Sequence, residues 1–159
     1  MIAADAFVAP GARVLGDVVM GSESSVWYGA LVNGEAAQVE VEPQANIQDN
    51  CVVEATPGHP VRIGSGVSVG HNARIYGAAI GPRSLIAIGA TVLPGAVVGA
   101  QSIVAANAIV PEGMVVPPRT LVLGRGRLAR EVTEAEIARI DGGARAYARL
   151  SRELVGKYD

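Results

Sequence analysis

Four side chains near the middle of the chain could transfer protons or bind a metal ion: Glu54, His59, His71 and Tyr76. Histidine exchanges protons near neutral pH and is also a common metal ligand, and a carboxylate can act as a general base or general acid. A tyrosine hydroxyl can donate a hydrogen bond to a substrate carbonyl or oxyanion. Glu54, His71 and Tyr76 therefore suit acid–base catalysis on a small organic substrate.

Each of these residues also has an interpretation without catalysis. His71 could be an interface histidine bonded to Asp49 or to a backbone carbonyl, and Glu54 could be a solvated or arginine-paired glutamate. Tyr76 could fill space at an interface, and His59 could be an exposed loop histidine. Alternatively, His59, His71 and Glu54 form a set of two histidines and one carboxylate, which suits zinc or ferrous iron. The sequence leaves these alternatives open.

A six-residue repeat must position these residues. Aliphatic residues or methionine recur every six positions in four blocks, and a small residue usually stands two positions earlier. The blocks run from Val8 to Val32, Val41 to Val53, Ile63 to Ile75 and Ile80 to Val122. This pattern predicts an all-β solenoid, the left-handed parallel β-helix, in which three short strands make one triangular coil. Side chains alternate across a strand, so both residues of a unit face inward, and Cys51 at a small position is a packing residue.

The repeat is interrupted in three places, and loops that interrupt a solenoid tend to carry function. Extra residues separate Val32 from Val41 and Val53 from Ile63, and one residue is missing between Ile75 and Ile80. Both histidines, several carboxylates and Tyr76 lie in or beside these breaks. The candidate site therefore belongs to the interruptions rather than to the regular coils.

The pattern changes after Gly124, which divides the chain into a β-helix over residues 1–124 and a segment over 125–159. Residues 125–130 are a basic connector, and Thr133 with Glu136 forms a capping box that predicts a helix. Gly142-Gly143 is expected to break or kink it before a second amphipathic stretch. We expect this C-terminal helical segment to pack on a wall of the β-helix.

Composition supports a thin, strand-rich fold and excludes some partners. The 159 residues are 50% hydrophobic but only 4% aromatic, with 20 glycines, which suits short strands and tight turns rather than a thick core. The net charge is −2, so the chain has no excess of positive charge to bind the phosphates of a nucleic acid. No apolar run is long enough to cross a membrane. One cysteine and no basic signal-peptide region favour a cytoplasmic protein.

Several segments resemble the γ-class carbonic anhydrases and their hexapeptide-repeat relatives. They are NIQDNCVVEATPGHPVRIG, VSVGHNARIYGAAIG, LIAIGATVLPGA and REVTEAEIAR. The resemblance implies a homotrimer with active sites between subunits, each holding zinc on three histidines. Zinc lowers the pKa of its bound water, and the resulting hydroxide attacks carbon dioxide.

The resemblance carries over unevenly to the site residues. The family's Gln-Asp pair is present as Gln48 and Asp49, and the histidine of its VGH motif is His71. The other two histidine positions hold Glu54 and Tyr76. The chain contains two histidines in total, so the three-histidine zinc site cannot form from it.

Position 33 changes the expected substrate. The family's Arg-Gly-Asp is Asn33-Gly34-Glu35 here, and losing the arginine removes a fixed positive charge. We therefore expect a substrate more neutral than bicarbonate, with Asn33, Glu35, Gln48, Asp49 and His59 binding it or forming the subunit interface.

These observations favour a diverged enzyme with no cofactor, catalysing a cyclisation, elimination or hydrolysis in the cleft between subunits. One alternative is a non-catalytic trimeric scaffold or small-molecule-binding protein. Another is a metal-dependent lyase or hydrolase with a rebuilt His/Glu site holding zinc or iron. A hexapeptide acyltransferase is less favoured, because such enzymes usually carry a long catalytic loop and the loops here are short.

Overall fold

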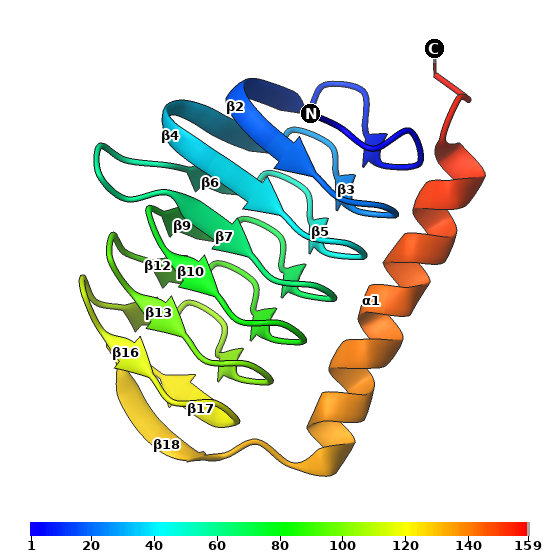
Figure 1. The fold of residues 1–159 in the computed structure, drawn as a ribbon. Helices are drawn as coiled ribbons and strands as arrows, with labels where there is room; N and C mark the ends of the chain where they lie inside the picture. The colour runs from blue at the N-terminus through cyan, green and yellow to red at the C-terminus, as the bar shows by residue number, and fades with distance from the viewer. Residues whose placement is uncertain (159) are drawn as a thin grey trace.

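The protein is described here by a computed structural model covering residues 1–158 (Figure 1). Its short strands stack into a left-handed parallel β-solenoid with three walls, which confirms the fold predicted from the six-residue repeat. One helix runs along the outside of the coils, and the two ends of the described chain lie at the same end of the molecule.

The first wall is formed by one strand from each coil and ends in an antiparallel strand. Its members are β1 (Phe7–Val8), β3 (Ser25–Val26), β5 (Asn46–Ile47), β8 (Ser68–Val69), β11 (Leu85–Ile86), β14 (Ile103–Val104), β17 (Thr120–Leu123) and β18 (Arg127–Glu131). Part of the basic connector expected over residues 125–130 is thus strand β18, which pairs antiparallel with β17 and closes the last coil.

The other two walls share one continuous sheet, because two long strands bend from one wall to the other. These long strands are β2 (Arg13–Met20) and β4 (Leu31–Val41). The second wall continues through β6 (Val52–Glu54), β9 (Arg74–Tyr76), β12 (Thr91–Val92) and β15 (Ile109–Val110). The third wall continues through β7 (Val61–Ile63), β10 (Ala79–Ile80), β13 (Val97–Val98) and β16 (Val115–Val116).

The core is a stack of aliphatic side chains inside the prism. The repeating large positions are fully enclosed, as in Val26, Ile47, Val69, Ile86, Val104 and Val122, each 0% exposed. The small positions are enclosed as well, with Ala45, Cys51 and Ala73 at 0%. Burying one Val or Ile side chain contributes roughly 1.5–3 kcal/mol, so the stack supplies much of the driving force for folding.

One corner needs a left-handed backbone, which glycine supplies at Gly29 and Gly89 and asparagine supplies in three other coils. Asn50, Asn72 and Asn107 have φ values of 59°, 60° and 58°. Asparagine tolerates this region better than most residues because its side chain can bond locally. This turn column fixes the direction in which the chain enters the second wall.

The C-terminal segment forms one uninterrupted helix, α1 (Glu134–Leu154), so the expected break at Gly142-Gly143 is wrong. The capping box is confirmed, because the Thr133 hydroxyl accepts from Glu136 N and the Glu136 carboxylate accepts from Thr133 N. The helix buries Ile137, Ile140, Ala144, Ala148 and Ser151 against the first wall. This burial outweighs the low helix propensity of two glycines.

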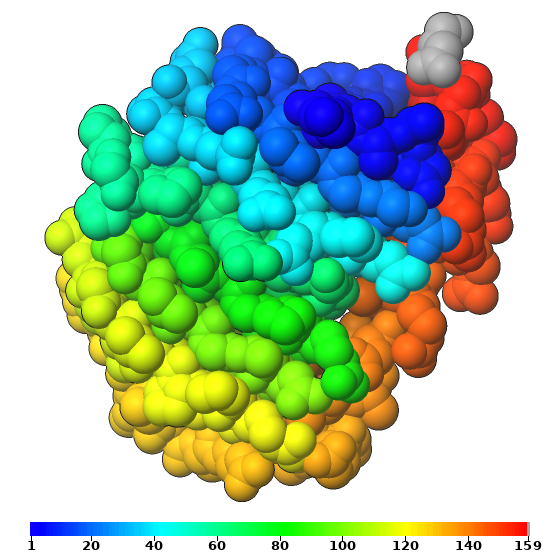
Figure 2. All heavy atoms as spheres, viewed as in Figure 1, coloured from blue at the N-terminus to red at the C-terminus, as the bar shows by residue number. Residues whose placement is uncertain are grey.

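Ion pairs tie α1 to the turns at the border of the third and first walls. Arg83 Nε and Nη2 donate to the two oxygens of Asp141 at 3.0 and 2.6 Å. Arg119 pairs with Glu134, and Arg152 pairs with Glu23. The helix therefore lies as a continuous band along one side of the coils (orange to red in Figure 2).

Within the described residues, no helix combines the length and the apolar character needed to cross a bilayer.

Candidate functional site

Asn33, Glu54 and Tyr76 form a column where the second wall turns toward the third. The strand register pairs Asn33 with Glu54 and Glu54 with Tyr76, so successive members are about 4.8 Å apart along the stack. The preceding residue in each strand points into the core, so these three side chains point outward. All three are half-buried. We call them the acid–base column.

The members of the acid–base column differ in how firmly they are held. Asn33 Oδ1 accepts a hydrogen bond of 3.0 Å from the backbone N–H of Glu35, whose own side chain is exposed. Within residues 1–158, neither the Glu54 carboxylate nor the Tyr76 hydroxyl has a side-chain hydrogen bond or an ion pair. Both groups are therefore available to a substrate or to another protein copy.

His71 lies at the opposite border of the second wall, stacked on Asp49 of the preceding coil. The His71 Nδ1 to Asp49 Oδ1 distance is 3.8 Å, and both side chains are about two-fifths exposed. At this distance the two groups lie close together without a hydrogen bond, so a modest rotation of either side chain would bring Asp49 onto Nδ1. A cavity of about 330 Å³ opens beside this pair and is also lined by Tyr28, Tyr147 and Leu150.

One copy of the chain does not bring the two borders together. His71 lies in the turn before β9 and Tyr76 lies at the far end of β9, so the length of this strand, about 7 Å, and part of the turn separate them. Proton transfer needs heavy atoms within about 3 Å or one bridging water. A site that used both His71 and the acid–base column would need a second copy.

Gln48 and Asp49 are adjacent in sequence but lie in different surroundings. Asp49 is at the corner with His71, whereas Gln48 is only 8% exposed and lies beneath α1. Its Nε2 donates to Asn46 Oδ1 at 3.0 Å. Gln48 therefore faces the helix-covered first wall.

His59 sits on a small hairpin that extends the break after Glu54. Thr56 and His59 exchange backbone hydrogen bonds of 3.0 and 2.8 Å, and the His59 residue is exposed. A Cβ added at Gly77 would lie 2.7 Å from His59 Cβ, so the hairpin packs directly over the residue after Tyr76. His59 thus borders the acid–base column and not His71.

The donor groups of one chain do not make a metal site by themselves. Within residues 1–158, no three His, Cys, Asp or Glu side chains converge on a point that could hold a metal ion. Zinc on three histidines does not fit this donor set, since the column presents a carboxylate and a phenol.

Two aromatic residues, Tyr28 and Tyr147, lie beside His71, and the sequence analysis did not place either of them at the candidate site. Tyr28 lies one coil before Asp49, and burial raises the pKa of the Tyr147 hydroxyl. Tyr28 is 21 residues before Asp49, three more than a regular coil of 18, so only the pairing of β3 with β5 shows that it lies one coil before Asp49. Tyr147 comes from the helix, and only the packing of α1 brings it to this corner.

Comparison with known proteins gives a consistent family. No family model matches the chain. A Methanocaldococcus jannaschii protein named "Probable carbonic anhydrase" is 50% identical over 155 residues, covering 97% of this chain and 98% of that protein. The mitochondrial γ carbonic anhydrase 1 of Arabidopsis thaliana is 37% identical, covering 93% of this chain and 56% of that protein. A solved hexapeptide transferase family protein from Anaplasma phagocytophilum superposes with a TM-score of 0.91 at 33% identity, covering 96% and 90% of the two chains.

Proposed function

The chain belongs to the γ-class carbonic anhydrase family, and from this premise we propose that it is an acid–base enzyme working without the family's three-histidine zinc site. The observation that carries the proposal is the acid–base column, in which the strand register sets Glu54 beside Tyr76. Simple loss of a metal site would not require two proton-transferring groups at the ligand positions.

In the proposed arrangement the protein is a homotrimer, and each site combines the acid–base column of one copy with the Asp49–His71 corner of the next. Glu54 removes a proton from the substrate or from water, and His71 returns a proton to the leaving group. Tyr76 donates a hydrogen bond to the oxygen that gains negative charge. Asn33 offers its amide in place of a guanidinium, which favours a neutral small organic substrate.

A complementation experiment tests whether the two borders act in one site. Hydrolysis of p-nitrophenyl acetate serves as the probe of reactivity, with carbon dioxide hydration measured alongside. Glu54→Gln and His71→Ala should each abolish the hydrolysis. If the two variants are unfolded, mixed in equal amounts and refolded, about a quarter of the interfaces regain both intact borders in a cyclic trimer.

The outcomes separate the alternatives. Recovery to about a quarter of wild-type activity supports a shared site, whereas no recovery means the two borders do not cooperate. A folded trimer with no activity toward any probe would favour a non-catalytic scaffold or binding protein.

A rebuilt metal site is the second candidate, and the position of His59 is what favours it. The His59 backbone lies over Gly77, whose N–H donates to the Glu54 carbonyl at 2.9 Å, so His59 and Glu54 share one border. The imidazole itself extends toward Gly95 of the next coil, so a shared metal would require the ring to turn back toward Glu54. With His71 from a neighbouring copy they would supply two imidazoles and a carboxylate, which suit zinc or iron. Stoichiometric metal in protein grown with both metals, lost in His59→Ala, would favour this candidate.

A further inference from the structure

A column of turn residues runs along the corner between the third and first walls, directly beside α1. Each member has a left-handed backbone, with φ between 56° and 65°, and each later member donates its N–H to the turn of the preceding coil. The members, on successive coils, are Glu23, Gln44, Gly66, Arg83, Gln101 and Arg119. We call them the polar column. Gly66 is its one member without a side chain that could reach toward the helix.

Three members of the polar column form ion pairs with α1 in regular order. The pairs are Arg119 with Glu134, Arg83 with Asp141, and Glu23 with Arg152. Asp141 and Arg152 are eleven positions apart, which is about 16 Å of helix. Their partners are three coils apart, which is about 14 Å along the column. These ion pairs therefore fix the register, and each coil corresponds to nearly four residues of α1.

This register sets Arg145 level with Gly66 and Arg149 level with Gln44. Gly66 offers no side chain, and Gln44 is neutral, with its Nε2 donating to Glu23 at 2.7 Å. Among the residues that the structure describes, neither Arg145 nor Arg149 makes an ion pair. The ladder of ion pairs is thus interrupted for two coils, where two neighbouring arginines of α1 have no carboxylate opposite them.

The two carboxylates that flank this interruption are already bonded. Asp141 accepts two hydrogen bonds from Arg83. Glu23 accepts one hydrogen bond from Gln44 and one from Arg152. Like charges one turn apart on a helix repel and destabilise it, so the two facing guanidiniums of the interruption cost free energy unless an anion joins them. An added anion would therefore stabilise the protein at this place.

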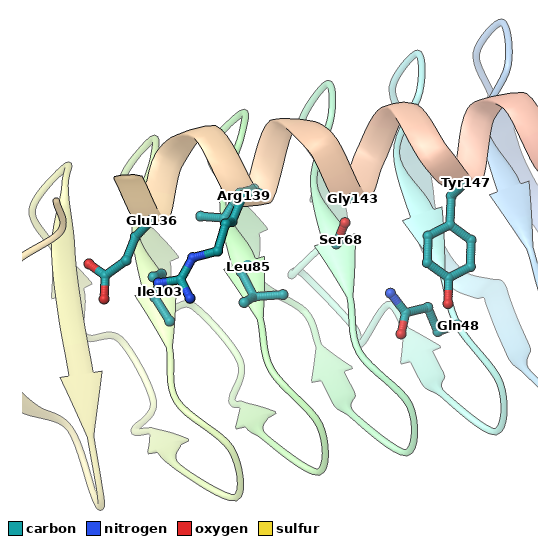
Figure 3. A pocket seen from close by; sticks show the side chains of 9 residues that line it. Gln48, Ser68, Leu85, Ile103, Glu136, Arg139, Gly143 and Tyr147 are labelled. Carbon is teal, nitrogen blue, oxygen red and sulfur yellow. The ribbon is translucent and has the colours of Figure 1, made fainter. Parts of the chain in front are cut away.

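A cavity of about 340 Å³ lies over the interruption. Its lining is Gln44, Gly142, Arg145, Ala148, Arg149 and Arg152. Gly142 has no side chain, and a Cβ added there would meet nothing within 4 Å, which keeps that end of the cavity open. Arg139, by contrast, leaves α1 on another side, toward Leu85 and Ile103 of the first wall (Figure 3). Arg145 and Arg149 therefore share a cavity of their own, at the small end of ordinary ligand pockets in volume.

We propose that this cavity binds two linked phosphate groups, as found in inorganic diphosphate or in a nucleoside diphosphate. A guanidinium binds a phosphate through two parallel hydrogen bonds. Arg145 and Arg149 are neighbours on the helix surface, about 5–6 Å apart at Cβ, so each takes one phosphate of the pair. The lining contains no residue of the acid–base column or of the Asp49–His71 corner, so the site stands whether or not the proposed catalysis does.

Calorimetric titration of the full chain at low ionic strength tests the proposal. The probes are inorganic diphosphate, inorganic phosphate, ADP and succinate. We expect diphosphate to bind more tightly than phosphate or succinate, with an affinity that falls as salt is added. Arg145→Gln and Arg149→Gln should each weaken diphosphate binding about fivefold or more. Arg139→Gln is the matched control, because it removes an arginine of α1 that lies outside this cavity, and it should bind normally.

Melting curves show whether the variants fold. Without ligand, Arg149→Gln should melt no lower than the wild type, because the repulsion with Arg145 is gone. It should also lose most of the rise in melting temperature that diphosphate gives to the wild type. Tighter binding of ADP than of diphosphate would identify a nucleotide as the source of the phosphates, and equal or weaker binding would identify free diphosphate.

Three results would overturn the proposal. One is the absence of diphosphate binding, and another is binding of phosphate or succinate as tight as that of diphosphate. The third is equal weakening by Arg139→Gln and Arg149→Gln, which would mean that the anion responds to the charge of the whole helix and not to this cavity. Because Glu54→Gln should bind diphosphate normally, failure of the catalytic proposal is distinguishable from failure of this one.

Discussion

Cys51 shows how completely a single small position of a coil is sealed from solvent. Its side chain is 0% exposed, and Sγ donates to the Gly70 carbonyl at 3.0 Å. Burial raises the pKa of the Cys51 thiol to about 12, so the reactive thiolate is scarce in the folded protein. We expect a thiol reagent at pH 8 to label Cys51 only as fast as the coils unfold. Rapid labelling without denaturant would contradict this, and Cys51→Ala gives the background.

Gly77 is the residue on which the His59 hairpin rests. Its φ is 51°, and an added Cβ would lie 2.6 Å from Thr56 Oγ1. Gly77→Ala should therefore lower the free energy of unfolding by roughly 1–3 kcal/mol, measured by urea denaturation. Gly58→Ala is the control, because Gly58 has a φ of 77° in the same hairpin but open space around it. Equal losses in the two variants would mean that backbone strain, and not the contact with Thr56 and His59, explains the effect.

At the scale of elements, the capping box makes the start of α1 sensitive to acid. Arg130 and the Thr133 N–H lower the pKa of Glu136 to about 2 from a usual value of 4.5. The unfolded chain therefore takes up this proton first, so the contribution of Glu136 is complete above pH 4.5 and is lost as the pH falls toward 2. Glu136→Gln can still cap the helix but cannot titrate. Melting curves below pH 4.5 should fall less steeply for this variant, and parallel curves would contradict the assignment.

The elements differ in how far local sequence determines them. The six-residue period predicts the coils because the aliphatic side chain of each unit is buried inside the prism in the same way. The continuity of α1 through Gly142-Gly143 could not be predicted, since propensity favours a break there and only packing on the first wall restores the helix. Strand β18 was missed for the same reason: its pairing with β17 depends on where the last coil ends.

The sequence named candidate residues for the site but could not show how the fold groups them. The breaks in the repeat indicated Glu54, His71 and Tyr76, and the register then placed Glu54 beside Tyr76. The sequence could not assign His71 to the opposite border, because neither the period nor the breaks state which corner each turn occupies. The environment of Gln48 depends on α1, whose position is set by ion pairs far apart in sequence, such as Arg83–Asp141.

At the scale of the whole molecule, the proposed shared site requires the second wall to face a neighbouring copy. This wall carries one border at each edge, and a ring sets one edge of each copy against the other edge of the next. Leu31, Val52 and Ile109 point outward from it and are half-buried, which suits an apolar contact. The third wall also exposes valine, with Val97 43% exposed, and therefore supplies a comparison.

If the protein forms the proposed trimer, we expect Val52→Lys to convert it into monomers, because three ammonium groups would be brought together in an apolar contact. Val97→Lys on the third wall should leave the trimer intact. Sedimentation equilibrium measures the mass, and circular dichroism checks that both variants keep the solenoid. Esterase activity should disappear with the trimer in Val52→Lys and persist in Val97→Lys. Dissociation by Val97→Lys alone would place the interface on the third wall, where His71 of one copy could not meet Glu54 of the next.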